Sequence, residues 1–505
     1  MLSSASSASC DCPLLSAAVK KRTGSARRPE GAKPERPRRA PASAWVSDEN
    51  VALLTDFYEL AMARAYREEG LEEEAVFSLF VRRLPPRRNF LLACGLEDAL
   101  RYLETLRFHP AALESLRSFR ELPKDFLRWL ARFRFRGDVY AVPEGTPVFG
   151  NEPILEVVAP VAHGQLVETF LLNQVHLQTL LASKACRVVR AAAGRPVVDF
   201  GLRRMHGTDA GVKAARAFAV AGVEATSNVL AGRLYGIPVT GTMAHSYVQA
   251  HATEEEAFRE FARIYPETVL LVDTYDTLRG VEEVARLGQD LGRAFRVRAI
   301  RLDSGNLAVL AARARQILDR AGLSRIGIFA SCGLDEYRIA RLVAAGAPIS
   351  GFGVGTAMGV SEDEPALDIA YKLTSYAGRG RIKLSQGKRL LPGRKQIFRV
   401  EEEGRAVADV IAAYDEESAG RPLLEKVMEA GRRLPAGRRD WRAARERARR
   451  EMAGLPERVL AIERADPPYP VATSARLRRS FESIARGFVS GGRREPDSPS
   501  GGRRT

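Results

Sequence analysis

The sequence predicts an α/β fold with a parallel sheet or barrel, and the evidence lies between residues 196 and 352. There, short apolar runs repeatedly end in polar or glycine-rich residues and are then followed by a helical stretch. The runs recur at intervals of about 20 to 40 residues, which is the spacing of βα units. The predicted strands are 196–200, 237–240, 269–272, 297–302, 325–329 and 348–352, and the predicted helices are 226–234, 254–264, 278–291, 307–321 and 336–345.

The regions on both sides of these units have a different pattern. A helical stretch over 51–66 and a strand over 77–81 come first, and proline- and glycine-spaced β segments fill 139–158. A long helix, about 165–193, leads into the βα units, and short β segments return near 396–400. We therefore expect a basic disordered leader (1–46), an N-terminal domain with a linking helix (47–193), a barrel (194–380), a C-terminal part with an Arg-rich helix (381–471) and a disordered basic tail (472–505).

The charge is concentrated in three segments. The 505 residues include 78 Lys+Arg and 62 Asp+Glu, a net charge of +16. Residues 1–45 carry +6, residues 474–505 carry +5 and residues 432–450 carry +7, so the rest of the chain is at −2. A basic chain can bind nucleic acid or an anionic membrane, but this distribution makes nucleic acid an unlikely partner.

Composition excludes two classes of protein. With 45% hydrophobic and 28% charged residues, wholesale disorder is excluded. Because no run of about 18 apolar residues occurs, we also expect no transmembrane helix and no membrane partner. The five cysteines form no CxxC pair, so we expect reduced thiols and a cytoplasmic location. The Ser-, Ala- and Arg-rich leader has some transit-peptide character, which leaves a targeting role open beside a disordered extension.

Polar side chains follow the predicted strands, where a parallel barrel gathers its functional groups. Arg203 and Arg204 suit an anionic substrate, although a surface arginine pair is the alternative. His245 follows a Gly-Thr turn, and a structural histidine is its alternative. Asp273 and Asp276 could hold a metal or orient an imidazole, and Asp276 could instead cap a helix.

Three of the strand ends have the composition of anion-binding loops. Residues 303–306 (DSGN) and 331–335 (SCGLD) enter helices, where backbone amides and close approach favour phosphate. Residues 351–356 (GFGVGT) form a further candidate, although their spacing is not that of a dinucleotide-binding motif. Six strand ends with arginines, carboxylates, a histidine and phosphate-type loops together predict a phosphorylated sugar substrate and a divalent metal.

At these residues the sequence resembles the nicotinate phosphoribosyltransferase family. The resemblance runs in family order from about residue 50 to 400 and leaves out both tails. The matching segments are 54–62 (LTDFYELAM), 199–204 (DFGLRR), 226–232 (TSNVLAG), 241–246 (GTMAHS), 273–277 (DTYDT), 301–305 (RLDSG) and 391–396 (LPGRKQ).

The resemblance implies an irregular α/β barrel of the type II phosphoribosyltransferase kind, with an α/β sandwich domain built from the N- and C-terminal parts. It implies a homodimer whose active sites are shared between subunits. The implied reaction joins nicotinate and 5-phosphoribosyl 1-diphosphate to give nicotinate mononucleotide and diphosphate, coupled to ATP hydrolysis with Mg²⁺. This reaction is the entry of nicotinic acid into NAD synthesis.

The resemblance also assigns roles to residues. It makes His245 the histidine that ATP phosphorylates, with Asp273 orienting its ring. It makes Phe200 and Arg301 the groups that sandwich the pyridine ring. The other implied substrate contacts are Thr242, Tyr58 from the partner subunit, Arg203 or Arg204 for a carboxylate or phosphate, Asp303, Ser304 and Gly305 near the ribose and diphosphate, and Gly353, Gly355 and Thr356 at the 5-phosphate; the ATP pocket and metal ligands stay unassigned.

Nicotinamide phosphoribosyltransferase is the main alternative, because it shares the DFG, histidine and DSGN features. Asn306 is more like that enzyme. Asn228, however, stands where the amide-specific enzyme has an aspartate, and a neutral amide there does not repel nicotinate. A nucleic-acid-binding protein that acts through residues 432–450 and the tails is an alternative of another class. Against it, no aromatic residue that could stack on a base is interleaved with these arginines except Trp441.

Overall fold

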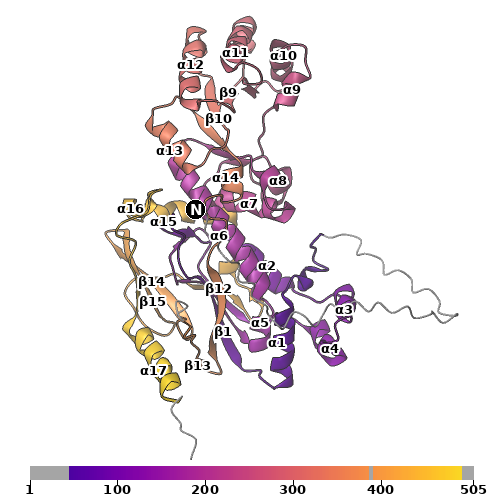
Figure 1. Cartoon of the computed structure of the whole chain (residues 1–505), viewed down its shortest axis with the longest axis vertical. Helices are drawn as coiled ribbons and strands as arrows, with labels where there is room; N and C mark the ends of the chain where they lie inside the picture. The colour runs from indigo at the N-terminus through magenta and orange to yellow at the C-terminus, as the bar shows by residue number, and fades with distance from the viewer. Residues whose placement is uncertain (1–44, 386–389, 439, 492–505) are drawn as a thin grey trace, which may run out of the picture. The chain divides into compact units, whose positions relative to one another are not determined.

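The computed structural model describes residues 45–385, 390–438 and 440–491, with side chains to residue 488 (Figure 1). The elements described below all belong to the unit that begins at Val46. The predicted leader falls on residues 1–46 and so lies outside the described residues, apart from its last two positions.

The βα units form a six-stranded parallel sheet. Its strand order is β7-β6-β11-β10-β9-β8, from β6 (Val197–Asp199), β7 (Ala225–Thr226), β8 (Val269–Leu271), β9 (Ala299–Leu302), β10 (Gly327–Ala330) and β11 (Gly351–Val354). The helices that follow strands are α7 (Thr208–Ala221), α8 (Val229–Tyr235), α11 (Thr277–Leu291), α12 (Leu307–Arg320), α13 (Glu336–Ala344) and α14 (Thr356–Gly359). Within the described residues β7 and β8 are the two sheet edges, so the structure shows a parallel sheet and no closed barrel.

The second predicted strand is wrong in its position. The strand beside β6 is Ala225–Thr226, and Thr226 had been predicted as the first residue of a helix. Residues 237–240 contribute only an isolated bridge, between Thr226 and Val239. The apolar run around Ile237 is explained by burial of that side chain in the core below the sheet, where it is 4% exposed.

Helix α6 (Glu168–Ala191) connects the two parts of this unit and lies at their centre in Figure 1. Its N-terminal half packs into a core with β1 (Glu74–Val81), β5 (Pro153–Pro160) and α2 (Leu96–Thr105). Its C-terminal half belongs to the core of the parallel sheet. The apolar residues of the long predicted helix therefore serve two cores.

The first core lies on a sheet built from both ends of the chain. This seven-stranded antiparallel sheet has the order β13-β12-β1-β5-β3-β17-β18. Its strands before the parallel sheet are β1, β3 (Asp138–Ala141) and β5, and those after it are β12 (Ile369–Tyr376), β13 (Arg379–Gly380), β17 (Glu425–Glu429) and β18 (Arg432–Arg433). A second sheet, β16-β14-β15-β19, contains β14 (Lys395–Glu402), β15 (Arg405–Ala413), β16 (Arg421–Pro422) and β19 (Val471–Thr473).

The C-terminal prediction is wrong over residues 472–491. Strand β19 pairs with β15 in parallel, and α17 (Ala475–Gly491) follows it as a helix. Leu477, on the first turn of α17, is 2% exposed, which explains why this arginine-rich stretch is ordered. Residues 492–505 lie outside the described residues. No described helix has the length and apolar character needed to cross a lipid bilayer.

Candidate functional site at the strand ends

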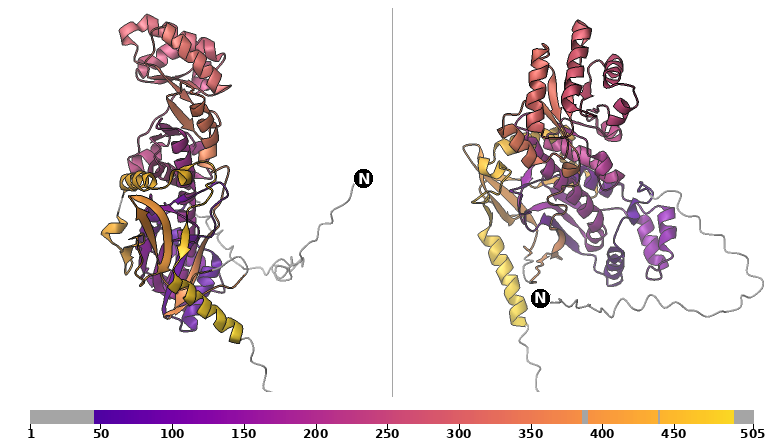
Figure 2. Two further views of the ribbon diagram at one scale, coloured as in Figure 1. Left: turned by 90° about the vertical axis from the view of Figure 1, so that its left-hand side faces the viewer. Right: turned by 45° about the horizontal axis from the view of Figure 1, so that its top comes forward.

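The carboxyl ends of β6, β8, β9, β10 and β11 lie side by side along one edge of the parallel sheet, as the registers of these parallel strands require. This row of strand ends, and not the edge strands β7 and β8, is called the sheet edge below. The views in Figures 1 and 2 place β9 and β10 at the end of the unit farthest from α1 (Phe57–Glu68). The predicted site residues of the strand ends therefore come together, and their contacts define the site.

Arg301, in β9, is held by three side chains from three different loops. Its Nε donates to Ser331 Oγ at 2.9 Å, its Nη1 donates to Thr242 Oγ1 at 2.8 Å, and its Nη2 lies 3.1 Å from Asp303 Oδ2. The guanidinium plane is thereby fixed, because all three nitrogens are engaged. One cationic group thus links the ends of β9 and β10 with the loop before α9 (His245–Gln249).

Asp303 and Asp273 organise the loop after β9. Asp273 Oδ2 accepts hydrogen bonds from the Asp303 amide at 2.8 Å and from Ser304 Oγ at 2.6 Å. Asp303 Oδ1 accepts from Ser331 Oγ at 2.5 Å. Gly305 has a φ of +73°, a left-handed conformation that favours glycine, so the DSG turn is fixed by its sequence.

His245 lies at the same edge but not against Asp273. Its Nδ1 lies 3.2 Å from Thr274 Oγ1, and its Nε2 lies 3.9 Å from Asp303 Oδ2. The side chain is 42% exposed. In the described structure Thr274 contacts the ring, and Asp273 accepts hydrogen bonds from the Asp303 loop. That Asp273 orients the ring stays a prediction.

Phe200 and Arg301 face each other at the end of β6, with the guanidinium carbon 5.4 Å from the ring centroid. A flat ring between them needs two contact separations, about 7 Å in all. Insertion of a pyridine ring therefore requires Arg301 or Phe200 to move. A Cβ at Gly353 would lie 2.7 Å from the Phe200 ring, so glycine is required there for the ring to occupy this place.

Asn228 is buried, and both ends of its amide are used. Its Oδ1 caps α8 by accepting from the Ala231 amide at 3.0 Å, and its Nδ2 donates to the Gly211 carbonyl at 3.1 Å. Its main-chain amide donates to Thr226 Oγ1. Thr226 in turn donates to Asp199, whose pKa is raised by burial despite the bonds from Thr226 and Gly201. Asn228 thus supports the loop that carries Phe200.

Most of the remaining predicted substrate contacts are exposed. Arg203 and Arg204 lie in an exposed turn, and neither side chain has an ion-pair or hydrogen-bond partner within the described residues. Ser304 and Thr356 are exposed, and Gly355 precedes α14 directly. These groups are available to an anionic ligand at the sheet edge.

Tyr58 is the predicted site residue that the chain does not bring to this edge. It lies on α1, where its side chain is 45% exposed, at the opposite end of the unit from β9 in Figures 1 and 2. Burial and the carboxylates of Glu168 and Glu59 raise the pKa of its hydroxyl. Within one chain Tyr58 therefore cannot reach the strand-end groups.

The carboxylates at the strand ends fit a Mg²⁺ ion that substrate phosphates would help to hold. No group of three or more His, Cys, Asp or Glu side chains in the described residues forms a complete metal cage. Mg²⁺ is usually held by one or two carboxylates together with substrate phosphates. Asp273 Oδ1 is buried and lacks a hydrogen-bond partner in the described structure, and Asp303 is 26% exposed, so both offer the oxygen ligands that Mg²⁺ prefers.

Comparisons with known proteins identify the family. Residues 53–176 match the nicotinate phosphoribosyltransferase N-terminal domain, and residues 196–391 match the nicotinate phosphoribosyltransferase family. The chain belongs to the nicotinate phosphoribosyltransferase family. It is 54% identical over 426 residues to nicotinate phosphoribosyltransferase pncB2 of Mycobacterium tuberculosis, covering 84% of this chain and 92% of that protein. It is 42% identical to the nicotinate phosphoribosyltransferase of Bacillus subtilis, covering 73% of this chain and 78% of that protein.

A solved structure supports the same assignment. The crystal structure of human nicotinic acid phosphoribosyltransferase has a TM-score of 0.75 and 28% identity, and the match covers 86% of this chain and all of that one. Nicotinate-nucleotide pyrophosphorylase from Pyrococcus furiosus, with a TM-score of 0.66 and 23% identity, shares the fold.

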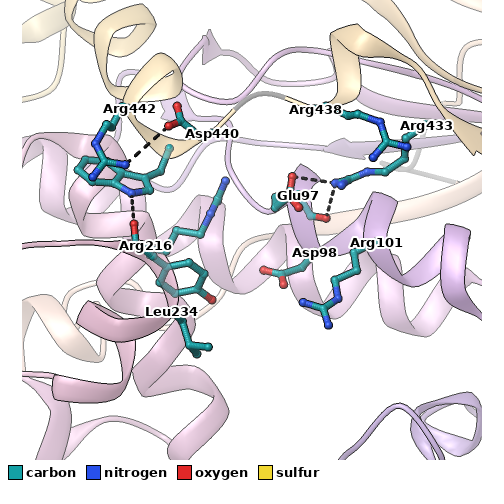
Figure 3. A pocket seen from close by; sticks show the side chains of 11 residues that line it. Glu97, Asp98, Arg101, Arg216, Leu234, Arg433, Arg438, Asp440 and Arg442 are labelled. Atoms are coloured by element: carbon teal, nitrogen blue, oxygen red, sulfur yellow. Dashed lines mark hydrogen bonds and ion pairs between the residues drawn. The ribbon is translucent and has the colours of Figure 1, made fainter.

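In this nicotinate phosphoribosyltransferase family member, a separate cavity of about 470 Å³ lies between α2, α8 and α15 (Trp441–Ala453) (Figure 3). Its arginines are largely paired: Arg433 lies 2.7 Å from Glu97, and Arg438 lies 3.1 Å from Glu104. Trp441 Nε1 donates to the Tyr235 carbonyl at 2.7 Å. The Arg-rich segment therefore joins α15 to its neighbours through internal ion pairs and hydrogen bonds.

Two residues of the site were not singled out by sequence reasoning, although Ser331 lies in the predicted anion-binding loop 331–335. Ser331 bridges Arg301 and Asp303, and Thr274 contacts His245. Both follow buried strands, as the other site residues do. The signal was therefore their position, but a hydroxyl at a strand end is too common to be singled out without its contacts.

Proposed function

We propose that this chain is an ATP-dependent nicotinate phosphoribosyltransferase of NAD synthesis, and that it forms nicotinate mononucleotide and diphosphate from nicotinate and 5-phosphoribosyl 1-diphosphate. The observation that carries the proposal is the convergence of Phe200, Arg301, His245 and Asp303 at one sheet edge of a chain in this family. The six parallel strands would be the wall of an irregular barrel of the type II phosphoribosyltransferase kind.

The site's own groups suit this chemistry. Phe200 and Arg301 would bind the pyridine ring between an aromatic face and a guanidinium, and Arg203 or Arg204 would bind an anionic group by charge-assisted hydrogen bonds. The ribosyl carbon becomes positive as diphosphate departs, and Asp303 offers a carboxylate to stabilise that charge. Asp273 and Asp303 would hold Mg²⁺, which neutralises charge on the departing diphosphate. Gly353, Gly355 and Thr356 would bind the 5-phosphate through a close-approaching backbone.

His245 is proposed to accept a phosphoryl group from ATP. Its Nδ1 is engaged with Thr274, whereas its Nε2 lies beyond hydrogen-bond distance of Asp303 and is available as the nucleophile. The Nε2–P bond would form as the bond to the leaving ADP breaks, and water would later cleave the phosphohistidine to release phosphate. The energy of this hydrolysis can drive closure of the site or product release.

We propose a homodimer with shared active sites because the chain exposes two apolar patches. One lies on α8, where Val229 is 72% exposed beside Leu230 and Leu234. The other lies around Phe57 and Tyr58 on α1, where the Phe57 ring lies 5.3 Å from that of Phe119. Exposed apolar patches of this kind mark interaction surfaces, and a partner subunit would supply the Tyr58 that one chain cannot bring to its own site.

A mixing experiment tests the shared site. Tyr58→Ala and His245→Ala should each lack ATP-stimulated turnover as homodimers. A heterodimer of the two contains one site with both residues intact, so a refolded equimolar mixture should regain about one quarter of wild-type activity. No regain in a mixture shown by mass photometry to be dimeric would contradict the shared site.

Base selectivity and ATP coupling are tested together. Wild-type chain and His245→Ala are assayed for mononucleotide formation from nicotinate and from nicotinamide, with and without ATP. We expect turnover of nicotinate alone, stimulated by ATP in the wild type and unstimulated in the variant. Complete ATP stimulation of His245→Ala would contradict the phosphohistidine.

Two further points belong to the proposal. Nucleic-acid binding is not proposed, because the arginines of α15 are bonded to Glu224, Glu446 and main-chain carbonyls of the same chain. A cytoplasmic location is supported by the described cysteines Cys94, Cys186 and Cys332, which are free thiols.

A further inference from the structure

A buried cluster of five charged side chains lies behind the strand ends, where α6 meets the parallel sheet. Lys184 of α6 is 1% exposed, and its Nζ donates to Glu336 Oε2 at 2.6 Å and to Asp363 Oδ1 at 2.7 Å. Arg88 binds Asp363 with two nitrogens, at 2.5 and 3.1 Å. Arg187 Nε donates to Glu336 Oε1 at 2.8 Å. Lys184 is the one member that contacts both carboxylates.

Each carboxylate is attached to a different loop of the site. Glu336 is the first residue of α13, immediately after the loop that carries Ser331. Asp363 follows α14, and the turn before it is bonded back onto that helix: the Ser361 amide donates to the Met358 carbonyl and the Glu362 amide donates to Ala357. Ser361 is fully buried with a φ of +46°, so this turn is held rigidly.

The charges explain why the cluster is tight. Burial raises the pKa of Asp363 and of Glu336, but the bonds from Arg88, Lys184 and Arg187 outweigh burial, and both pKa values lie below their usual range. Both carboxylates are therefore ionised. Three cations face two anions, so each carboxylate keeps one arginine even without the lysine.

We propose that Lys184 is a positioning residue for 5-phosphoribosyl 1-diphosphate, because it ties the Gly353–Thr356 loop and the 331–335 loop to one point on α6. It acts through Asp363 and Glu336 and does not touch substrate. The inference rests on the proposed function, which places the 5-phosphate at Gly353, Gly355 and Thr356. Nicotinate would contact neither Asp363 nor Glu336, but the 331–335 loop also holds Arg301 through Ser331. The affinity for nicotinate should therefore depend on Lys184 less than the affinity for 5-phosphoribosyl 1-diphosphate does.

The test is Lys184→Met, which preserves the length of the side chain and leaves two neutral ion pairs, Arg88–Asp363 and Arg187–Glu336, in place. Misplacement of binding groups by about 1 Å costs up to about 100-fold. We expect the KM for 5-phosphoribosyl 1-diphosphate to rise at least tenfold, and the KM for nicotinate to rise by a smaller factor. Asp363→Asn, which weakens the same tether from its other end, should act in the same direction.

Lys395→Met is the matched control. Lys395 is equally buried and lies 3.0 Å from Glu156, but this pair belongs to the antiparallel sheets and contacts no loop of the site. Its loss leaves Glu156 without its cation, so the control is at least as destabilising. An equal rise in KM for 5-phosphoribosyl 1-diphosphate in both lysine variants, or an unchanged KM in Lys184→Met and Asp363→Asn, would overturn the proposal.

A binding measurement separates this inference from the proposed function. Calorimetric titration with 5-phosphoribosyl 1-diphosphate and Mg²⁺, without nicotinate, should give a dissociation constant at least tenfold weaker in Lys184→Met than in Lys395→Met. If the wild-type chain binds this ligand but forms no mononucleotide, the proposed function fails and the positioning role is still decided by the two dissociation constants.

Discussion

Two arginine–aspartate pairs in this molecule have nearly the same composition and opposite surroundings. Arg301 and Asp303 lie at the open edge of the parallel sheet, with side chains 13% and 26% exposed, and Arg301 faces Phe200. Arg399 in β14 and Asp409 opposite it in β15 have side chains 1% and 0% exposed, and Arg399 faces Phe149. Each pair combines a guanidinium, a carboxylate and an aromatic ring.

The difference lies in what surrounds each pair. Arg399 donates to Asp409 through two nitrogens and to the Pro147 carbonyl, and Tyr469 donates to the same aspartate. The pair is closed on all sides, and burial and the neighbouring Asp409 raise the pKa of the Tyr469 hydroxyl. Arg301 is held by neutral hydroxyls that can rearrange when a ligand enters. Exposure and exchangeable partners, rather than the ion pair itself, distinguish a site from a structural pair.

The largest expected effect compares the two arginines directly. Arg399→Ala leaves Asp409 buried without its cation, so the free energy of unfolding should fall by about 3–5 kcal/mol. Arg301→Ala should leave the melting temperature nearly unchanged but lower kcat/KM for nicotinate by about 100-fold or more, because the ring loses its cationic face. Denaturant unfolding and steady-state kinetics on both variants measure the two effects. Equal losses of stability would remove the distinction drawn above.

A second prediction concerns pH and the antiparallel part of the molecule. Burial, assisted by Arg136 and Arg67, lowers the pKa of His163 to about 4 from an unfolded value near 6.5. The stability that this neutral ring contributes is complete above pH 6.5 and is lost as the pH falls toward 4. Across that window the loss is about 3 kcal/mol.

His163→Phe supplies the comparison for the pH effect. The ring lies 4.6 Å from that of Phe133, so a phenyl group keeps the aromatic contact without a titrating nitrogen. Urea unfolding at pH 7 and pH 4 should show a steeper loss in the wild type than in the variant. Parallel pH profiles would show that His163 is not the group responsible.

A third prediction concerns Gly353, which lies against the ring of Phe200. Gly353→Ala puts a methyl group against Phe200, which lies 2.7 Å from the ideal Cβ position. We expect the KM for nicotinate to rise about tenfold as the ring of Phe200 is displaced, an effect of about 1.4 kcal/mol. Gly194→Ala, at a positive φ of +82° with open space around it, controls for a simple loss of stability.

The last prediction concerns Asn228, where we expect an effect on stability and none on base selectivity. Asn228→Asp keeps the oxygen that caps α8 but turns the donor to the Gly211 carbonyl into an acceptor, so stability should fall by about 1–3 kcal/mol. Because the amide is used inside the fold, we expect no gain of nicotinamide turnover. Thermal unfolding and a nicotinamide assay measure the two outcomes. If the variant gained nicotinamide turnover, residue 228 would select between nicotinate and nicotinamide directly.

The sequence allowed the parallel sheet to be predicted because each βα unit contains its own signal: an apolar run, a polar end and an amphipathic helix. The helix Glu254–Ile264 was predicted to the residue, and the structure shows Thr253 as its N-cap. The strand near residue 237 was misplaced because burial alone does not distinguish a strand from a loop packed under a sheet. The ordered helix α17 was missed because its buried side chains are few among many arginines.

The site was predictable to the level of which loops carry it, and not to the level of contacts. Family order indicated Arg301, Asp303 and His245 by position. It could not show that Asp273 bonds to the Asp303 loop while Thr274 contacts His245, because both residues follow the same strand and only their side-chain directions differ. The Lys184 cluster was also invisible, because its five members come from positions between 88 and 363.

The late position of helix α15 in the chain has a consequence for folding during synthesis. Its buried Trp441, Ala444 and Ala448 belong to the core of the parallel sheet, and the helix packs on α7, yet it is synthesised some 50 residues after the family match ends at 391. A nascent chain that has emerged only to residue 391 therefore exposes the apolar surface of α7. The parallel sheet should acquire its protease resistance only when α15 has left the ribosome.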